Sequence, residues 1–160
     1  MSEIDKVLQY SRAREFERRA LPSPPARELA IVACMDARVN PAEILGLMEG
    51  DAHVIRNAGG VVTEDVIRSL TISQQILGTK EIMLIHHTGC GMVSSNEEEM
   101  KDRIEAECGM RPPFSLGAFP DLEEDVRSGI ARIKESPFIA HKDEVRGFVY
   151  DLEEGCLREV

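Results

Sequence analysis

Three features of the sequence predict an α/β fold built on a mainly parallel sheet. Short apolar runs rich in β-branched residues recur along the 160-residue chain, and segments with apolar residues at helical spacing separate them. The last two runs are joined by a short turn that contains glycine, which predicts a hairpin. Strands that alternate with helices imply parallel crossover units with helices on both faces. With strands numbered along the chain, we expect the order 2-1-3-4 and an antiparallel strand at the C-terminal edge.

The first elements are expected to be a helical arm and a buried strand. Residues 3–19 have apolar positions at helical spacing among charged residues, and the proline-rich stretch 21–25 interrupts that pattern. Residues 1–25 are therefore expected to form an N-terminal arm. Leu29–Cys34 is a continuous apolar run, which is typical of a strand buried on both faces.

A short helix and a second strand follow the buried strand. Asn40 and Pro41 suit the first positions of a helix over 41–49, which Gly50 would end. The second strand is expected over 53–56. The remaining elements are expected to be a helix from Thr63 to Gly78, a strand over 81–86, an acidic helix over 95–108, a helix that begins near Asp121, and a hairpin of strands 146–152 and 156–160.

Composition excludes several classes of partner. The chain has 19 Lys and Arg against 29 Asp and Glu, so its net charge is −10. This charge does not favour nucleic acid or an anionic membrane surface. No apolar run approaches the roughly 20 residues of a membrane helix, and the start lacks a signal-peptide pattern. We therefore expect one cytoplasmic domain over residues 1–160.

Four scattered cysteines are too few for a disulfide scaffold, and in a cytosolic chain they suit metal ligands, a nucleophile or buried packing residues. Cys34 follows the first strand, and His87 and Cys90 follow the third. In an open α/β sheet, ligands bind beyond the carboxyl ends of the strands where the strand order reverses. Cys108, on the apolar side of a helix, and Cys156, in the hairpin, are expected to be packing residues.

Cys34, His87 and Cys90 suit one zinc ion. Two thiolates and one imidazole match the tetrahedral preference of zinc, and three protein ligands leave a fourth position for water or substrate. Asp36 lies close to this site along the chain, where it can orient a water or bind the metal itself. Arg38 can hold Asp36 off the metal through a bidentate pair.

The motifs CMDAR (34–38), RNAGG (56–60) and HTGCG (87–91) resemble those of the β-class carbonic anhydrases, and most closely those of the short microbial members. The resemblance runs from about residue 26 to the end of the chain. It implies that zinc-bound hydroxide reversibly converts carbon dioxide to bicarbonate and a proton. It also implies one zinc per subunit on Cys34, His87 and Cys90, with Asp36 and Arg38 as a catalytic dyad.

The same resemblance implies a homodimer or a dimer of dimers, with the N-terminal helix across the partner subunit. Gly59 is expected to form part of the pocket wall, and Arg56 and Asn57 could bind an oxyanion or form a tight turn. His53 replaces a phenylalanine of plant-type members, so it is a candidate for substrate binding or proton relay. His86 is expected in the core or behind the ligands.

Two alternatives remain open from the sequence. Relatives with this zinc site hydrolyse carbonyl sulfide or carbon disulfide, so the motifs define the metal more firmly than the substrate. A zinc-binding regulatory protein without turnover is the second alternative, in which Asp36 stays on the metal. Gly89 also stands where many relatives have aspartate, and His141 is expected at the surface.

Overall fold

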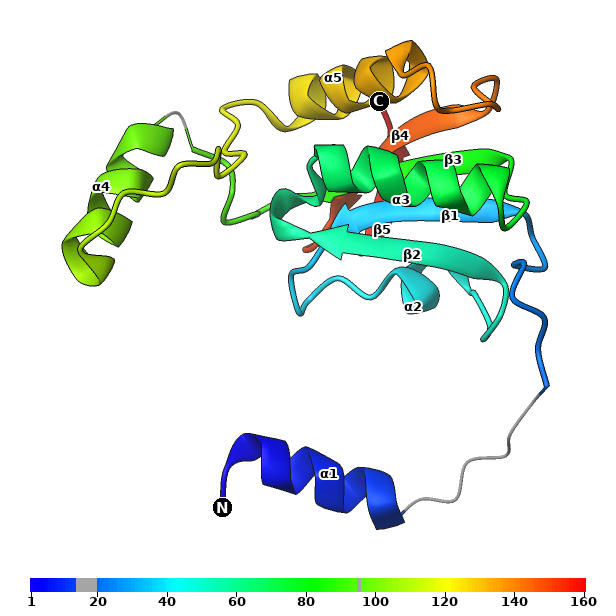
Figure 1. Ribbon diagram of the computed structural model, residues 1–160, viewed down its shortest axis with the longest axis horizontal. Coiled ribbons are helices and arrows are strands. Elements are labelled where there is room, and N and C mark those ends of the chain that lie inside the picture. Colours follow the sequence, from blue (N-terminus) through cyan, green and yellow to red (C-terminus); the bar gives the residue numbers. More distant parts are fainter. Residues whose placement is uncertain (14–19, 95) are drawn as a thin grey trace.

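The computed structural model describes residues 1–13, 20–94 and 96–160, and its centre is a five-stranded sheet (Figure 1). The strand order is β2-β1-β3-β4-β5. All neighbours are parallel except β4 and β5, which are antiparallel. The predicted fold class, strand order and antiparallel edge are thus confirmed. The strands are β1 (Leu29–Cys34), β2 (Ala52–Asn57), β3 (Glu81–His87), β4 (Val145–Asp151) and β5 (Cys156–Glu159).

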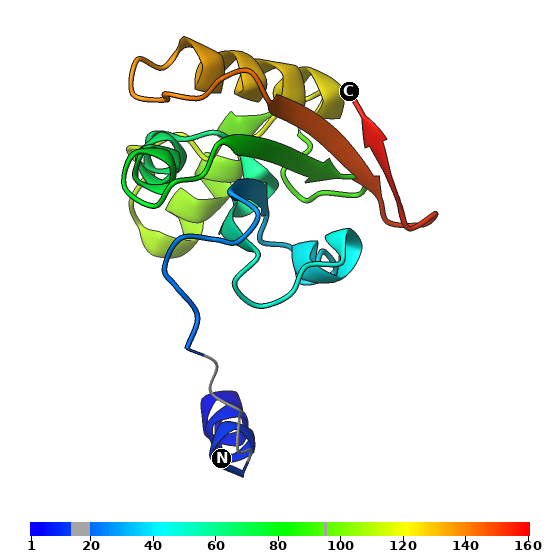
Figure 2. The same cartoon turned by 90° about the vertical axis from the view of Figure 1, so that its right-hand side faces the viewer.

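Helices cover both faces of this sheet. The pair α3 and α5 packs on one face, and the short α2 lies on the other (Figures 1 and 2). Two helices, α1 and α4, contain no buried residue. The helices are α1 (Glu3–Ala13), α2 (Pro41–Leu45), α3 (Glu64–Gln75), α4 (Glu97–Cys108) and α5 (Leu122–Glu135), with a short 3-10 turn η1 (Ala58–Gly60) after β2.

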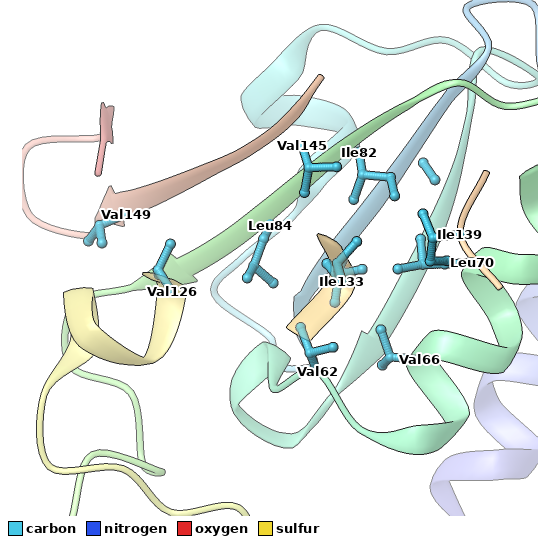
Figure 3. Packing of buried hydrophobic residues seen from close by; sticks show 12 residues of the cluster. Val62, Val66, Leu70, Ile82, Leu84, Val126, Ile133, Ile139, Val145 and Val149 are labelled. Carbon is cyan, nitrogen blue, oxygen red and sulfur yellow. The ribbon is translucent and has the colours of Figure 1, made fainter. Parts of the chain in front are cut away.

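The larger part of the core lies between the sheet and the α3/α5 layer. Figure 3 shows aliphatic side chains from both layers meeting there, including Leu70 of α3, Leu84 of β3 and Ile133 of α5. Two glycines let α5 approach closely. A Cβ at Gly129 would lie 2.6 Å from Leu84, and one at Gly147 of β4 would lie 2.3 Å from Val126 of α5. This close seating fixes α5 against β3 and β4.

Side-chain caps define where three of the helices begin. Thr63 accepts a hydrogen bond from the backbone N–H of Val66 at the start of α3. Asp121 accepts one from Glu124 at the start of α5. These bonds satisfy N–H groups that have no partner inside a helix. Asn96 caps α4 in the same way.

The predicted end of the helix after Pro41 was wrong. The helix expected over 41–49 ends at Leu45, because Gly46 takes a left-handed conformation (φ 62°) and closes it with backbone bonds to the preceding turn. Asn40 holds the N-cap position, but its side chain makes no cap bond with any described residue. The arm helix expected over 3–19 is seen from Glu3 to Ala13, and its remainder lies outside the described residues.

The packing predicted for two cysteines was also wrong. Cys108 and Cys156 are both exposed, because α4 and the outer strand β5 each bury little against the core. His141 is exposed as expected. Within the described ranges, no helix combines the length and apolar character that crossing a membrane requires.

Candidate metal centre

Two neighbouring strands bring three soft donor side chains together. Cys34 is the last residue of β1, His87 is the last of β3, and Cys90 lies in the loop that follows β3. Their donor atoms all lie within 4.8 Å of one another. The two sulfur atoms are 3.9 Å apart. All three side chains are buried, so two thiols and one imidazole form a buried cluster at the carboxyl edge of the sheet.

One nitrogen of His87 is prepared to bind a cation. Its Nδ1 lies 2.9 Å from the carbonyl oxygen of Thr88, which assigns the ring proton to Nδ1. Its Nε2 is buried and has no hydrogen-bond partner among the described residues. Burial lowers the pKa of His87 and thereby favours the neutral ring. A buried lone pair without a partner is costly unless a metal ion or another ligand satisfies it.

The donor set fits zinc. Two sulfurs and one imidazole nitrogen match its tetrahedral preference and leave a fourth position. Burial raises the pKa of Cys90, so without a cation the thiol form is favoured. A bound dication reverses that preference because it binds the thiolate. Metal binding at this cluster should therefore release protons.

Asp36 lies beside the cluster, and Arg38 determines its orientation. The guanidinium donates from Nε to Asp36 Oδ1 at 2.9 Å and from Nη2 to Oδ2 at 2.7 Å. Nη2 also donates to the carbonyl of Gly89 at 2.9 Å. Asp36 Oδ2 remains 3.8 Å from Nε2 of His87. These bonds from Arg38 hold the pKa of Asp36 well below its usual range, so the carboxylate stays ionised.

Arg56 has a different role from the oxyanion binding that the sequence suggested. Its Nε donates to the carbonyl of Cys34, and its Nη2 donates to the carbonyls of Asp36 and Val39, at 2.8–2.9 Å. It therefore holds the loop after β1 in place. Sequence reasoning missed this role. Arg56 pairs in register with Ala33, which places it beside the end of β1 and the loop that follows, but this pairing is known only from the structure.

The two glycines of η1 allow the chain to pass close to the cluster. Gly60 has φ +70°, and a Cβ there would lie 3.0 Å from the backbone nitrogen of Cys34. Gly59 has φ +79°, and its Cβ would lie 3.1 Å from Met92, two residues beyond Cys90. Met92 packs against the buried cluster of Cys34, Cys90 and Phe119. Gly59 thus lies against Met92, on the side of the cluster where Met92 packs.

His53 is not brought to this cluster. It pairs in register with Ala30 near the start of β1, whereas Cys34 ends that strand. Its Nδ1 lies 2.8 Å from Ser73 Oγ, which lies 2.7 Å from Thr79 Oγ1. His53 thus belongs to a polar chain beneath α3, and within one subunit this placement gives its predicted substrate role no support.

His86 and Phe119 form part of the surroundings of the cluster. His86 is buried, as expected, and its Nε2 lies 2.7 Å from Asp125 Oδ2. Phe119 is buried with Cys34 and Cys90. Sequence reasoning missed Phe119, because it lies in a loop without periodic pattern.

Comparison with known proteins agrees with this geometry. Residues 29–110 match the model of the carbonic anhydrase family. The chain is 54% identical over 140 residues to beta-carbonic anhydrase 1 of Mycobacterium tuberculosis, covering 88% of this chain and 86% of the relative. It is 38% identical over 157 residues to a carbon disulfide hydrolase of Acidithiobacillus thiooxidans, covering 82% and 72%.

A solved structure gives the same result for the fold. The carbonic anhydrase of Streptococcus mutans superposes with a TM-score of 0.93 at 41% identity, covering 100% of this chain and 98% of that one. Three observations therefore agree: the family match, the fold of the solved structure, and the cluster of Cys34, His87 and Cys90. The chain belongs to the β-class carbonic anhydrase family.

Proposed function

We propose that this protein is a zinc-dependent carbonic anhydrase that reversibly hydrates carbon dioxide to bicarbonate and a proton. One observation carries the proposal: Cys34, His87 and Cys90 converge, while Arg38 holds Asp36 3.8 Å from the open nitrogen of His87. We assign one zinc ion per subunit to the three donors. Zinc supplies a Lewis acid that lowers the pKa of water towards neutrality.

The residues around the cluster then have separate tasks. Asp36 is ionised and accepts hydrogen bonds, so it can orient the attacking water with a lone pair towards the carbon of carbon dioxide. Arg38 keeps Asp36 in that position and away from the three donors. Asp36 does not retain the released proton, because its pKa lies far below neutrality. The proton must therefore leave to buffer or to another group.

We also propose that Gly59 and His53 contact the substrate. Gly59 supports the assignment through its approach to Met92 beside the cluster. His53 forms its polar chain with Ser73 and Thr79 at another part of the sheet, so its contribution would have to come through a neighbouring subunit.

We also propose a homodimer or a dimer of dimers in which residues 1–25 form an arm across the partner and residues 1–160 form one unit. The apolar side chains of α1 support this, since Ile4 is 71% and Val7 is 63% exposed. A cytoplasmic location fits the four cysteines, none of which is paired in the part of the chain that the structure describes.

Hydrolysis of carbon disulfide or carbonyl sulfide is a second candidate, because carbon disulfide hydrolases are among the relatives at 31–44% identity. The decisive experiment follows carbon dioxide hydration by stopped flow from about pH 6.5 to 9, around the near-neutral pKa of zinc-bound water. We expect zinc-loaded protein to be active, with a rate that rises with pH.

Two cysteine variants provide the control for this experiment. Cys90→Ser should lose zinc and activity together, whereas Cys108→Ser should keep both, because Cys108 is exposed and outside the cluster. Sulfide release without carbon dioxide hydration would identify the hydrolase. Full zinc occupancy without turnover on any of these substrates would identify a regulatory protein.

A further inference from the structure

A second histidine is buried beside the proposed metal ligands without joining them. Ala33 and Ile85 are partners near the end of the β1–β3 ladder, so the next residues, Cys34 and His86, continue along neighbouring strands. The ring of His86 is 1% exposed. Its Nδ1 has no hydrogen-bond partner among the described residues. A buried nitrogen without a partner costs free energy, so the other contacts of the His86 ring must offset that cost.

Those other contacts link α5 to the metal cluster. The Nε2 of His86 donates to Oδ2 of Asp125 at 2.7 Å. The His86 ring also contacts Phe119: the two ring centroids lie 5.3 Å apart at an interplanar angle of 32°. Phe119 is buried in one apolar cluster with Cys34 and Cys90. A chain of contacts thus runs from the Asp125 carboxylate to the two sulfur ligands.

Phe119 also fixes the backbone of the loop that carries Cys90. Its N–H donates to the carbonyl of Met92 at 3.1 Å, and its carbonyl accepts from the N–H of Ser94 at 2.9 Å. Val93 and Phe119 form a parallel bridge. A shift of Phe119 as a whole, ring and backbone together, would therefore disturb both the apolar cluster around the two sulfurs and the backbone of the Cys90 loop.

The position of Asp125 is itself determined by packing. It lies in the first turn of α5, and α5 is seated on β3 and β4 through the close contacts at Gly129 and Gly147. The carboxylate is about four-fifths buried, with an exposed fraction of 22%. Because α5 is packed this closely, it cannot shift without a clash. The hydrogen bond therefore fixes the position of the His86 ring relative to α5, and its loss would let the ring move.

We propose that Asp125 is a positioning residue of the metal centre: through His86 and Phe119 it sets the arrangement of the Cys34 and Cys90 sulfurs. It touches neither metal nor substrate. This role rests on the proposed zinc function, but it concerns the geometry of the ligands and not the turnover of carbon dioxide. Groups that hydrogen-bond directly to a metal ligand commonly change metal affinity by about 10- to 100-fold when they are removed. Asp125 acts through two intervening side chains, so we expect an effect at the lower end of this range.

The test distinguishes the effect of the position of the hydrogen-bond acceptor from the effect of the negative charge of Asp125. Asp125→Asn keeps an acceptor oxygen in the same place but loses the charge, whereas Asp125→Glu keeps the charge but moves it by one methylene. Glu124→Gln is the matched control, because Glu124 is exposed in the same helical turn and pairs with Arg127 instead of His86. Zinc affinity is measured by chelator competition, and Co²⁺ is substituted so that its absorption reports the sulfur ligands.

We expect Asp125→Asn and Glu124→Gln to bind zinc within about threefold of the wild type, with unchanged Co²⁺ spectra. Asp125→Ala should weaken zinc binding by about tenfold or more, and Asp125→Glu should weaken it measurably; both should shift the sulfur-to-cobalt band. The Asn and Glu variants decide the question if the Ala variant does not fold.

Two results would overturn the proposal. One is unchanged affinity and spectrum in Asp125→Glu, and also in Asp125→Ala if that variant folds. The other is a loss in Asp125→Asn that exceeds the loss in Asp125→Glu, because charge and not position would then matter. Neither readout uses carbon dioxide, so a wild type that binds zinc without hydrating carbon dioxide would refute the proposed function and leave this test intact.

Discussion

At the scale of single residues, Arg38 connects the two segments that form the metal centre. It donates to both oxygens of Asp36 on the β1 side and to the carbonyl of Gly89 on the β3 side. The backbone N–H of Arg38 adds a third bond to Asp36. An exposed ion pair contributes little to stability. We therefore expect the main effect of this pair to be the orientation of the Asp36 carboxylate.

Removing the guanidinium should free Asp36 to become a fourth ligand. In Arg38→Ala we expect carbon dioxide hydration to fall by about 10²-fold, because the misplaced carboxylate takes the open position. Zinc release to a chelator should become slower, since four protein ligands replace three. Stopped-flow activity and chelator kinetics on the same sample measure both effects.

Arg27→Ala is the control for this variant. Arg27 also forms an exposed pair, with Asp51 at 3.1 Å, but away from the cluster. The Arg27→Ala variant should change activity little and the free energy of unfolding by no more than about 0.5 kcal/mol. Faster zinc release in Arg38→Ala would contradict the assigned role, because it would indicate general loosening of the site.

Residues could be predicted from the sequence where the fold class places them at one edge of the sheet, or where their partners are close along the chain. Cys34, His87 and Cys90 could be placed together because parallel strands end at one edge of the sheet. Asp36 and Arg38 are two positions apart, so their pairing needs no distant partner. His53 could not be placed, because its partner Ser73 comes from α3, 20 residues further along the chain.

At the scale of elements, η1 is the turn that lets the chain leave β2 beside the metal centre. Its Gly60 lies against backbone atoms of β1 and β3, strands that are each held by a neighbouring strand on both sides. Any side chain there must push into Cys34 and Ala33. We therefore expect η1 to tolerate no residue larger than glycine at this position.

Gly60→Ala should lower the free energy of unfolding by more than about 2 kcal/mol and weaken zinc binding. Gly78→Ala is the matched comparison: Gly78 has φ +77°, but a Cβ added there would have no described atom within 4 Å. It should cost only the left-handed backbone strain of about 1–2 kcal/mol and leave zinc affinity unchanged. Denaturant unfolding and chelator competition test both, and equal zinc affinities in the two variants would contradict this account.

Element type was easier to predict than element ends. β1 was predicted at its observed bounds, because an apolar run buried on both faces has a clear start and end. The helix after Pro41 stopped earlier than expected, since Gly46 and Gly50 are both able to end it and the sequence does not distinguish them. For α4, Cys108 was expected to pack on the apolar side of the helix, but α4 contains no fully buried residue and Cys108 is exposed.

At the scale of the whole molecule, helix α1 (Glu3–Ala13) adds nothing to the buried core of the subunit. None of its residues is buried, and it lies apart from the sheet in both views (Figures 1 and 2). An isolated helix of 11 residues is marginal in water, so packing must come from elsewhere. A second copy of the chain supplies that packing in the proposed homodimer.

A single charge on the arm distinguishes an assembled protein from a monomer. Val7→Asp puts a carboxylate on the apolar side of α1, and Gln9→Asp puts the same residue on an exposed polar position of the same helix. In a monomer both changes would shift stability by no more than about 0.5 kcal/mol, as surface substitutions do. In a dimer, only Val7→Asp buries an unpaired charge, so it should dissociate the assembly and lower the unfolding temperature. Sedimentation and thermal unfolding at matched concentrations measure this, and identical behaviour of the two variants would mean that α1 does not contact a partner through Val7.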